Sequence, residues 1–178
     1  MIDPPKADIL IVDDTLPNLR LLSKLLTDNG YKVRGVQNGK MALRAVEASP
    51  PDLILLDIMM PGMTGYEVCE QLKSGKARDI PIIFISALDD VEDKVKSFRV
   101  GGADYVAKPF QADEVLARVG THLALRRLQV QLNNLDEHVE QRVEARTNEL
   151  AKTVSELQSQ IQQLLADGGR PMIQRTVA

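Results

Sequence analysis

Three aspartates are the side chains of this 178-residue chain best suited to do chemistry. Two short apolar runs, Ile9–Val12 and Leu53–Leu56, lead directly into acids, the first into the pair Asp13 and Asp14 and the second into Asp57. Such runs are typical of buried parallel strands, whose carboxyl ends meet at one edge of a sheet. Three carboxylates gathered there would repel one another unless a cation lay among them. Oxygen ligands favour a hard divalent ion, so the pattern predicts a magnesium site and phosphoryl chemistry.

The elements that must position these acids alternate along the chain. Extended runs are predicted at 8–12, 31–36, 53–57, 81–86 and 105–107, and helices at 16–29, 39–48, 66–74 and 90–100, with a last helix opening near 111–113. In the helix at 39–48, we expect Met41, Ala45 and Val46 to lie on one side. Strict alternation indicates βαβ crossovers, so we predict an α/β fold in which helices cover both faces of a parallel sheet.

Two further polar residues end apolar runs of this kind. Ser86 closes the run at 81–86, and Lys108 follows the run at 105–107. Ligands of doubly wound sheets bind beyond the carboxyl ends of the strands. A lone polar residue at such a position is commonly an ordinary loop-facing side chain, but here four strands aim polar groups at one place. We therefore expect Ser86 and Lys108 to join the aspartates in a single site.

Composition narrows the classes of protein to consider. The chain is 44% hydrophobic, which predicts one globular domain with an appendage, and its net charge of −3 argues against a broad nucleic-acid-binding face. Its apolar runs are far shorter than the roughly 20 residues that span a bilayer, and its N-terminus lacks the regions of a signal peptide. We therefore expect a cytoplasmic protein with no membrane partner. The single cysteine, Cys69, is expected to be buried packing.

From about Ala7 to Leu125 the chain resembles the receiver domain of bacterial response regulators. The resemblance rests on the order and spacing of motifs in this sequence: Asp13-Asp14, Asp57 with Met60-Pro61-Gly62, Ser86-Ala87, and Gly102-Ala103-Asp104-Tyr105 leading to Lys108-Pro109-Phe110. It implies a five-stranded, doubly wound, flavodoxin-like sheet of order 2-1-3-4-5. It also implies that a histidine kinase or phosphotransfer protein donates a phosphoryl group.

The resemblance assigns the acids their roles. Asp57 is the implied phosphoacceptor, because a carboxylate can take a phosphoryl group as an acyl phosphate that later hydrolyses. Asp14, Asp57 and the backbone carbonyl of Met59 are the implied magnesium ligands, and Asp13 acts through a metal-bound water. Magnesium is thus the one cofactor expected. Met59 and Leu88 are apolar where some receivers guide hydrolytic water, which predicts slow to moderate self-dephosphorylation.

The resemblance also assigns roles to polar residues of the other strands. The ammonium of Lys108 and the hydroxyl of Ser86 suit phosphoryl oxygens, and the Lys108-Pro109 bond is implied to be cis. Ser86 and Tyr105 are the implied switch: the hydroxyl moves toward the phosphoryl group and the ring turns inward, unless Tyr105 is a plain half-buried strand residue. Asp104 and Arg118 resemble charged residues through which some receivers pair, or they are simply solvated.

The last helix is predicted to continue without a break to about Ala166. Residues that are apolar, except for one threonine, recur in it at alternating spacings of three and four, which is the pattern of a coiled-coil seam. They are Leu125, Leu128, Leu132, Leu135 and Val139, and then Thr147, Leu150, Val154, Leu157, Ile161 and Leu164. Val139, Val143 and Thr147 are four apart, which shifts the phase and is expected to unwind the supercoil locally. We predict a parallel homodimer through 125–164; a helix folded back on the domain or largely disordered is the alternative.

These patterns predict a receiver domain at 1–124, a coiled-coil helix at 125–167 and a flexible tail at 168–178. The segment at 142–150 resembles the signalling helix that links receivers to kinase or nucleotide-cyclase output domains. His138 lacks the flanking residues of a kinase phosphoacceptor.

The leading hypothesis is a phosphorylation-switched dimeric signalling module with an unidentified output partner. A phosphorylation-independent dimerising scaffold, or the front part of a longer kinase or cyclase protein, are the alternatives. An enzyme is disfavoured, because the sequence has no GxGxxG turn, no Walker lysine loop and no second acid two residues after Asp57.

Overall fold

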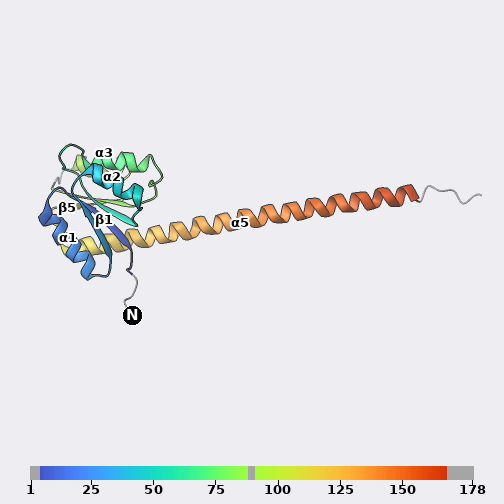
Figure 1. Cartoon of the computed structure of the whole chain (residues 1–178), viewed down its shortest axis with the longest axis horizontal. Coiled ribbons are helices and arrows are strands. Elements are labelled where there is room, and N and C mark those ends of the chain that lie inside the picture. Colours follow the sequence, from blue (N-terminus) through green and yellow to red (C-terminus); the bar gives the residue numbers. More distant parts are fainter. Residues whose placement is uncertain (1–4, 88–90, 168–178) are drawn as a thin grey trace, which may run out of the picture. The chain divides into compact units, whose positions relative to one another are not determined.

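The computed structural model of the chain describes residues 5–87 and 91–167. Strands and helices alternate through these ranges (Figure 1). The strands are β1 (Asp8–Val12), β2 (Lys32–Val36), β3 (Leu53–Asp57), β4 (Ile82–Ser86) and β5 (Asp104–Ala107). The helices are α1 (Leu16–Asp28), α2 (Gly39–Ala48), α3 (Gly65–Lys73), α4 (Val91–Arg99) and α5 (Ala112–Asp167). Every predicted element is present, so the predicted alternation is confirmed.

The five strands form one parallel sheet in the order β2-β1-β3-β4-β5. This order confirms the predicted doubly wound, flavodoxin-like topology. Strand β1 lies between β2 and β3, and β3 pairs with β4 so that Asp57 lies opposite Ile85. Because all the strands run the same way, their carboxyl ends share one edge of the sheet. Asp57 and Ser86 are the last residues of their strands, and Asp13 and Lys108 come directly after theirs.

The sheet has a hydrophobic core on each face because successive strand side chains point to opposite sides. Leu10 and Val12 belong to the core that α2 and α3 cover, whereas Ile9 and Ile11 belong to the core that α1 and the first turns of α5 cover. Figure 1 shows α2 and α3 on one side of the sheet and α1 on the other. With both faces covered, only the edges of the sheet remain available for a polar site.

Helix α2 buries only part of the predicted side: Val46 is buried and Ala45 packs against the core, but Met41 does not. Met41 is 46% exposed, so its predicted grouping with Val46 is wrong, and the fully buried residue is its neighbour Ala42. Asn38 caps the helix by accepting a hydrogen bond from the backbone N of Met41 at 2.9 Å, which fixes where the first turn begins. Ala42 and Val46, one turn apart, then face the sheet together. A small alanine suits this closely packed face better than a methionine.

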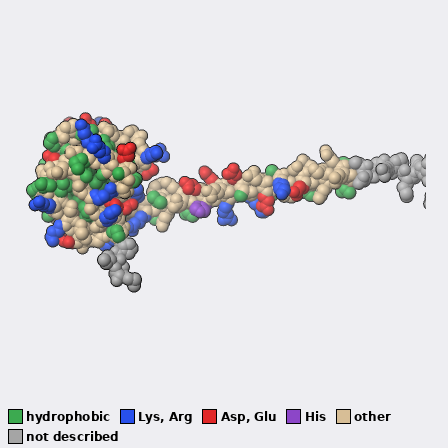
Figure 2. All heavy atoms as spheres, viewed as in Figure 1, with side chains coloured by type: hydrophobic (Ala, Val, Ile, Leu, Met, Phe, Trp, Pro, Cys, Tyr) green, Lys and Arg blue, Asp and Glu red, His purple; other side chains and the backbone are tan. Residues whose placement is uncertain are grey.

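The chain divides into two compact units, Met1–Gln129 and Val130–Ala178, and helix α5 contributes residues to both. In the first unit Val115, Val119 and Leu123 are buried against the sheet. The large apolar side chains from Leu125 to Leu164 are all exposed, and Figure 2 shows them among acidic and basic side chains on this helix. None of the helices in the described ranges is long and apolar enough to cross a membrane. The predicted tail at 168–178 lies outside the described residues.

Candidate phosphoryl-acceptor site

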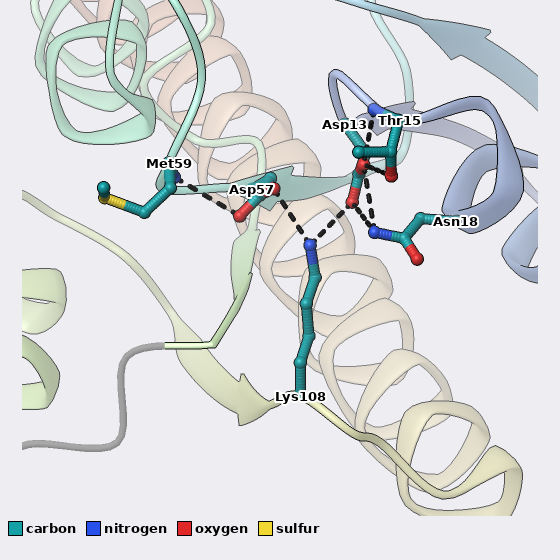
Figure 3. Close-up of polar contacts among 6 residues, drawn as sticks. All are labelled: Asp13, Thr15, Asn18, Asp57, Met59 and Lys108. Carbon is teal, nitrogen blue, oxygen red and sulfur yellow. Dashed lines mark hydrogen bonds and ion pairs between the residues drawn. The ribbon is translucent and has the colours of Figure 1, made fainter.

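Lys108 joins the carboxylates at the ends of two other strands (Figure 3). Its Nζ donates to Oδ2 of Asp13 at 2.8 Å and to Oδ2 of Asp57 at 2.9 Å. The side chains of Asp13 and Asp57 are only 2% and 6% exposed, and that of Lys108 is 18% exposed. Charges buried this deeply are stable only when they are paired and hydrogen-bonded. The sheet therefore holds one lysine between two acids that lie far apart in the sequence.

Asp13 is fixed by groups at the start of α1. Its Oδ1 accepts hydrogen bonds from the backbone N and the hydroxyl of Thr15, at 2.9 and 2.5 Å. The side-chain amide of Asn18 donates to both carboxylate oxygens, at 3.1 and 2.9 Å. Sequence reasoning missed Thr15 and Asn18. The available signal was an aspartate two residues before a helix-capping position, a spacing at which such carboxylates bind nearby backbone N–H groups.

Asp14 completes an acidic cluster with Asp13 and Asp57. One carboxylate oxygen from each residue lies within 4.8 Å of those from the other two. Three carboxylates from two strand ends are the donor set that a hard divalent cation takes, and Lys108 occupies only one oxygen of Asp13 and one of Asp57. The cluster therefore fits magnesium. The backbone N of Met59 donates to Oδ1 of Asp57 at 3.3 Å, and the role of its carbonyl remains a prediction.

Burial and charge act in opposite directions on these groups. Burial raises the pKa of Asp57 above its ordinary value, more than the nearby ammonium of Lys108 lowers it. Burial also opposes ionisation of Asp13, but hydrogen bonds from Lys108, Thr15 and Asn18 together hold its pKa below the ordinary value. The two carboxylates raise the pKa of Lys108 despite its burial. Asp57 is thus the acid whose ionisation the fold opposes.

Replacing Asp57 by asparagine is therefore expected to stabilise the metal-free protein at neutral pH. A carboxyl group whose pKa is higher in the folded state binds a proton more tightly there than in the unfolded state. The free energy of unfolding therefore falls as the pH rises from 3.8 through the raised folded-state pKa of Asp57. Above that pKa the loss of stability remains at its full size. Urea unfolding of Asp57→Asn in magnesium-free buffer should give a higher midpoint than the parent at pH 7, and the difference should shrink as the pH falls toward 3.8. A lower midpoint for the variant at pH 7 would contradict the assignment.

The predicted switch residues lie on neighbouring strands. Ser86, the last residue of β4, is fully buried, and its backbone oxygen accepts a hydrogen bond from the backbone N of Lys108 at 2.8 Å. Tyr105, on β5, lies opposite Phe84 of β4. It is 6% exposed, so its ring belongs to the core in this structure. The Lys108-Pro109 bond is cis, as the resemblance implied. The structure thus brings Ser86 beside Lys108. Tyr105 lies two residues before the end of β5.

Asp104 and Arg118 bind each other within the chain rather than being simply solvated. Nη1 of Arg118 lies 2.8 Å from one carboxylate oxygen of Asp104, and Nε2 of His122 lies 3.0 Å from the other. Arg118 also binds Glu114 one turn earlier on α5. Sequence reasoning missed His122, although its spacing of four residues from Arg118 places both on one face of the helix. This network joins the start of β5 to α5.

The side chains of the remaining described candidate residues do not belong to the acidic cluster, although the backbone N of Met59 contacts Asp57. Met59 is 59% exposed, and Leu88 lies outside the described residues. Cys69 is fully buried, as predicted, and burial raises the pKa of its thiol to about 11. His138 is exposed on α5, where Nδ1 lies 2.6 Å from the backbone oxygen of Asn134.

The chain belongs to the response regulator receiver domain family, whose family model matches residues 9–120. It is thus a receiver domain of two-component signalling, followed by a long helix. Among solved structures, a putative response regulator from Chloroflexus aurantiacus is 34% identical, with a TM-score of 0.65 over 67% of this chain and 98% of that one. The chemotaxis protein CheY4 of Vibrio cholerae is 28% identical, with a TM-score of 0.62 over 65% of this chain and 97% of that one.

Two curated relatives extend beyond the receiver domain. A probable cyclic di-GMP phosphodiesterase of Vibrio cholerae is 38% identical over 151 residues, which cover 84% of this chain and 34% of that protein. The probable transcriptional regulator ycf27 of Cyanidium caldarium is 45% identical over 121 residues, which cover 68% of this chain and 47% of that protein. The chain spans between about a third and a half of the length of these relatives.

Proposed function

We propose that the protein accepts a phosphoryl group on Asp57 from a histidine kinase or phosphotransfer protein. The observation that carries this proposal is the burial of Asp57 beside the Lys108 ammonium, with Asp13 and Asp14 clustered at the same edge. Phosphoryl transfer is catalysed mainly by positioning and by neutralising the charge on the phosphoryl oxygens. The site offers a nucleophile, a fixed cation and acidic ligands for a second cation, which together meet those needs.

In the proposed step, a carboxylate oxygen of Asp57 attacks the phosphorus of the donor phosphohistidine. The P–N bond breaks as the O–P bond forms, and the donor imidazole leaves with the electron pair. Lys108, held by Asp13, neutralises and orients the incoming phosphoryl oxygens. Magnesium held by Asp14, Asp57 and the carbonyl of Met59, and through water by Asp13, would supply further positive charge. The exposed, apolar Met59 side chain offers no group to activate water, which supports slow to moderate self-dephosphorylation.

A surface pocket beside the acidic site supports access by a protein donor. Its volume is about 420 Å³, and Asn18, Leu21, Lys108, Pro109 and Phe110 line it. Leu21 is 57% exposed there, and Asn18 and Lys108 both bind Asp13. A donor that covers the apolar side chains would therefore bring its phosphoryl group beside the charged ones.

We propose that Ser86 and Tyr105 transmit the phosphorylation state, and that α5 carries it onward as a parallel homodimeric coiled coil through 125–164. Support for the switch comes from the burial of both side chains on adjacent strands, where movement of one changes the space open to the other. Support for the coiled coil comes from its exposed apolar stripe, which stays in water unless another helix covers it. On this proposal the chain signals through binding rather than through enzymatic turnover.

One observation favours a second hypothesis, in which the chain is the N-terminal part of a longer signalling protein. The match to the Vibrio cholerae relative is longer than the receiver match, and only eight residues precede Ile9, so most of the additional matched length falls within α5. In that arrangement the helix would carry the receiver state to a domain attached to it. The phosphorylation chemistry of Asp57 is the same in both readings.

Incubating the protein with magnesium and a small acyl phosphate tests the proposed function directly. We expect a mass increase of one phosphoryl group, mapped to Asp57 after borohydride trapping, and slow loss of the label once the donor is removed. Chelating magnesium should abolish the increase, and Asp57→Asn is the matched control. A wild-type chain that stays unmodified with both the small donor and a panel of phosphorylated histidine kinases would overturn the proposal.

A further inference from the structure

The apolar stripe of α5 contains one irregularity. Its core positions recur every seven residues from Leu125 to Val139 and again from Thr147 to Ile161, but eight residues separate Val139 from Thr147. All of these residues are exposed along an unbroken helix. Removing a single residue between Val139 and Val143 would turn the whole stripe into regular heptads. One extra residue therefore interrupts an otherwise continuous seam.

The flanking sequence fixes where this eight-residue step lies. If the first heptad phase continued past Val139, the next two core positions would be Arg142 and Arg146. If the second phase extended backward from Val143, the core positions would be Glu140 and Asp136. Each continuation would bury charged side chains without partners, which costs several kcal/mol per charge. The step is therefore held between Val139 and Thr147 and cannot move along the helix.

A fixed step discriminates between ways of pairing two such helices. In a parallel pair in register, every core residue meets its own copy, and the two steps coincide. In an antiparallel pair overlapping along its full length, Leu150 would face Val139, but Val143 would face Arg146 and Thr147 would face Arg142. An antiparallel pair confined to the second heptad region would leave Leu125 to Val139 uncovered. Only the parallel arrangement in register covers the whole stripe without placing a charged side chain opposite it.

We infer that the step is a register key that restricts this surface to a second copy of the same chain, aligned parallel and in register. The charges beside the seam agree, since in this arrangement Arg146 approaches Ala151 and Gln131 approaches Asp136 across the interface, so like charges do not meet. A partner helix with regular heptads would lose phase with this one beyond the step and would leave about half of the stripe exposed to water. The inference deepens the proposed function, because it rests on the proposed coiled coil and names its partner.

Cysteine cross-linking tests the orientation. Leu150→Cys should form a disulfide with its own copy under oxidised glutathione, because, of the three arrangements, position 150 faces itself only in the parallel, in-register pair. The native Cys69 is fully buried and does not compete. A disulfide between Leu150→Cys and Val139→Cys would report the full-length antiparallel pair. A disulfide between Leu150→Cys and Ile161→Cys would report the antiparallel pair confined to the second heptad region. Cross-linking in a mixture without self-linking of Leu150→Cys would overturn the inference.

Deleting Gln141 tests the key itself, because the deletion makes the heptads regular from Leu125 to Leu164. Random pairing of two differently tagged chains makes about half of all dimers heterodimers. We expect the deletion variant and the parent each to pair mainly with its own kind, which reduces heterodimers to about a tenth of all dimers. Gln141→Ala, which keeps the step, should mix freely with the parent. Each variant's phosphorylation on Asp57 verifies that its receiver domain is folded.

The results separate this inference from the proposed function. Free mixing of the deletion variant with the parent would overturn the register key while leaving the homodimer intact. A chain that sediments as a monomer would overturn the key and the homodimer together, but labelling of Asp57 would still stand. Loss of labelling in the parent chain, with sorting intact, would instead overturn the proposed phosphoacceptor function.

Discussion

Replacing Lys108 by alanine is expected to lower the rate of phosphoryl transfer to Asp57 by about a hundred- to a thousandfold, the range found when one preorganised electrostatic group is removed from an active site. The Nζ of Lys108 binds both Asp13 and Asp57 within 2.9 Å, so it is already placed where negative charge gathers. Its position is set by the end of β5 and by the carboxylate of Asp13, and no rearrangement is needed for it to act. Rapid-mixing measurements with a small acyl phosphate would give the rate.

The same substitution carries a second readout. Without the ammonium, the carboxylates of Asp13 and Asp57 face each other uncompensated, so magnesium should stabilise Lys108→Ala more than it stabilises the parent. Lys24→Ala is the matched control, since Lys24 is 78% exposed on α1 and its ion pair among the described residues is with the exposed Asp28. Equal transfer rates for Lys108→Ala and Lys24→Ala would show that Lys108 does not assist the reaction.

Replacing Gly65 by alanine is expected to destabilise the fold by about 3 kcal/mol, the upper range for overpacking. Gly65 opens α3, and its backbone N donates to the backbone oxygen of Ile58 at 2.9 Å. An added Cβ would lie 2.3 Å from the backbone oxygen of Asp57 and 2.9 Å from Cα of Ile58. These are backbone atoms at the end of β3 and have no side-chain rotation with which to give way. The end of the strand that carries Asp57 must therefore shift.

Urea unfolding would measure the loss, and labelling of Asp57 would report the shift of the strand end. Gly120→Ala is the matched control, because Gly120 lies within α5 and an added Cβ there would meet no described atom within 4 Å apart from the backbone of its own helix turns. That change should stabilise the protein by about 0.5–1 kcal/mol, since alanine favours a helix more than glycine does. If Gly65→Ala unfolded at the same urea concentration as Gly120→Ala, the close contact with Asp57 would have no energetic consequence.

The sequence alone was enough to predict the sheet and the residues at its carboxyl edge. Short apolar runs and the helices between them are local signals, and a parallel α/β topology follows from their alternation with few alternatives. The ends of β1, β3, β4 and β5 therefore pointed to Asp13, Asp57, Ser86 and Lys108 without any coordinates. On α2 only Met41 was misplaced, because Met41 and Ala42 are adjacent and only the cap at Asn38 fixes which of them turns inward.

What the tertiary structure alone decided is which polar groups meet. The Lys108 contact with Asp13 spans 95 residues, and the binding of His122 to Asp104 joins α5 to β5. Helical and strand periodicities indicate which face a side chain occupies, but hydrogen bonds depend on separations fixed to a few tenths of an ångström by the packing of whole elements. Residue order thus determined the fold and the edge where the acids gather. The packed sheet decided that one lysine lies between two of those acids.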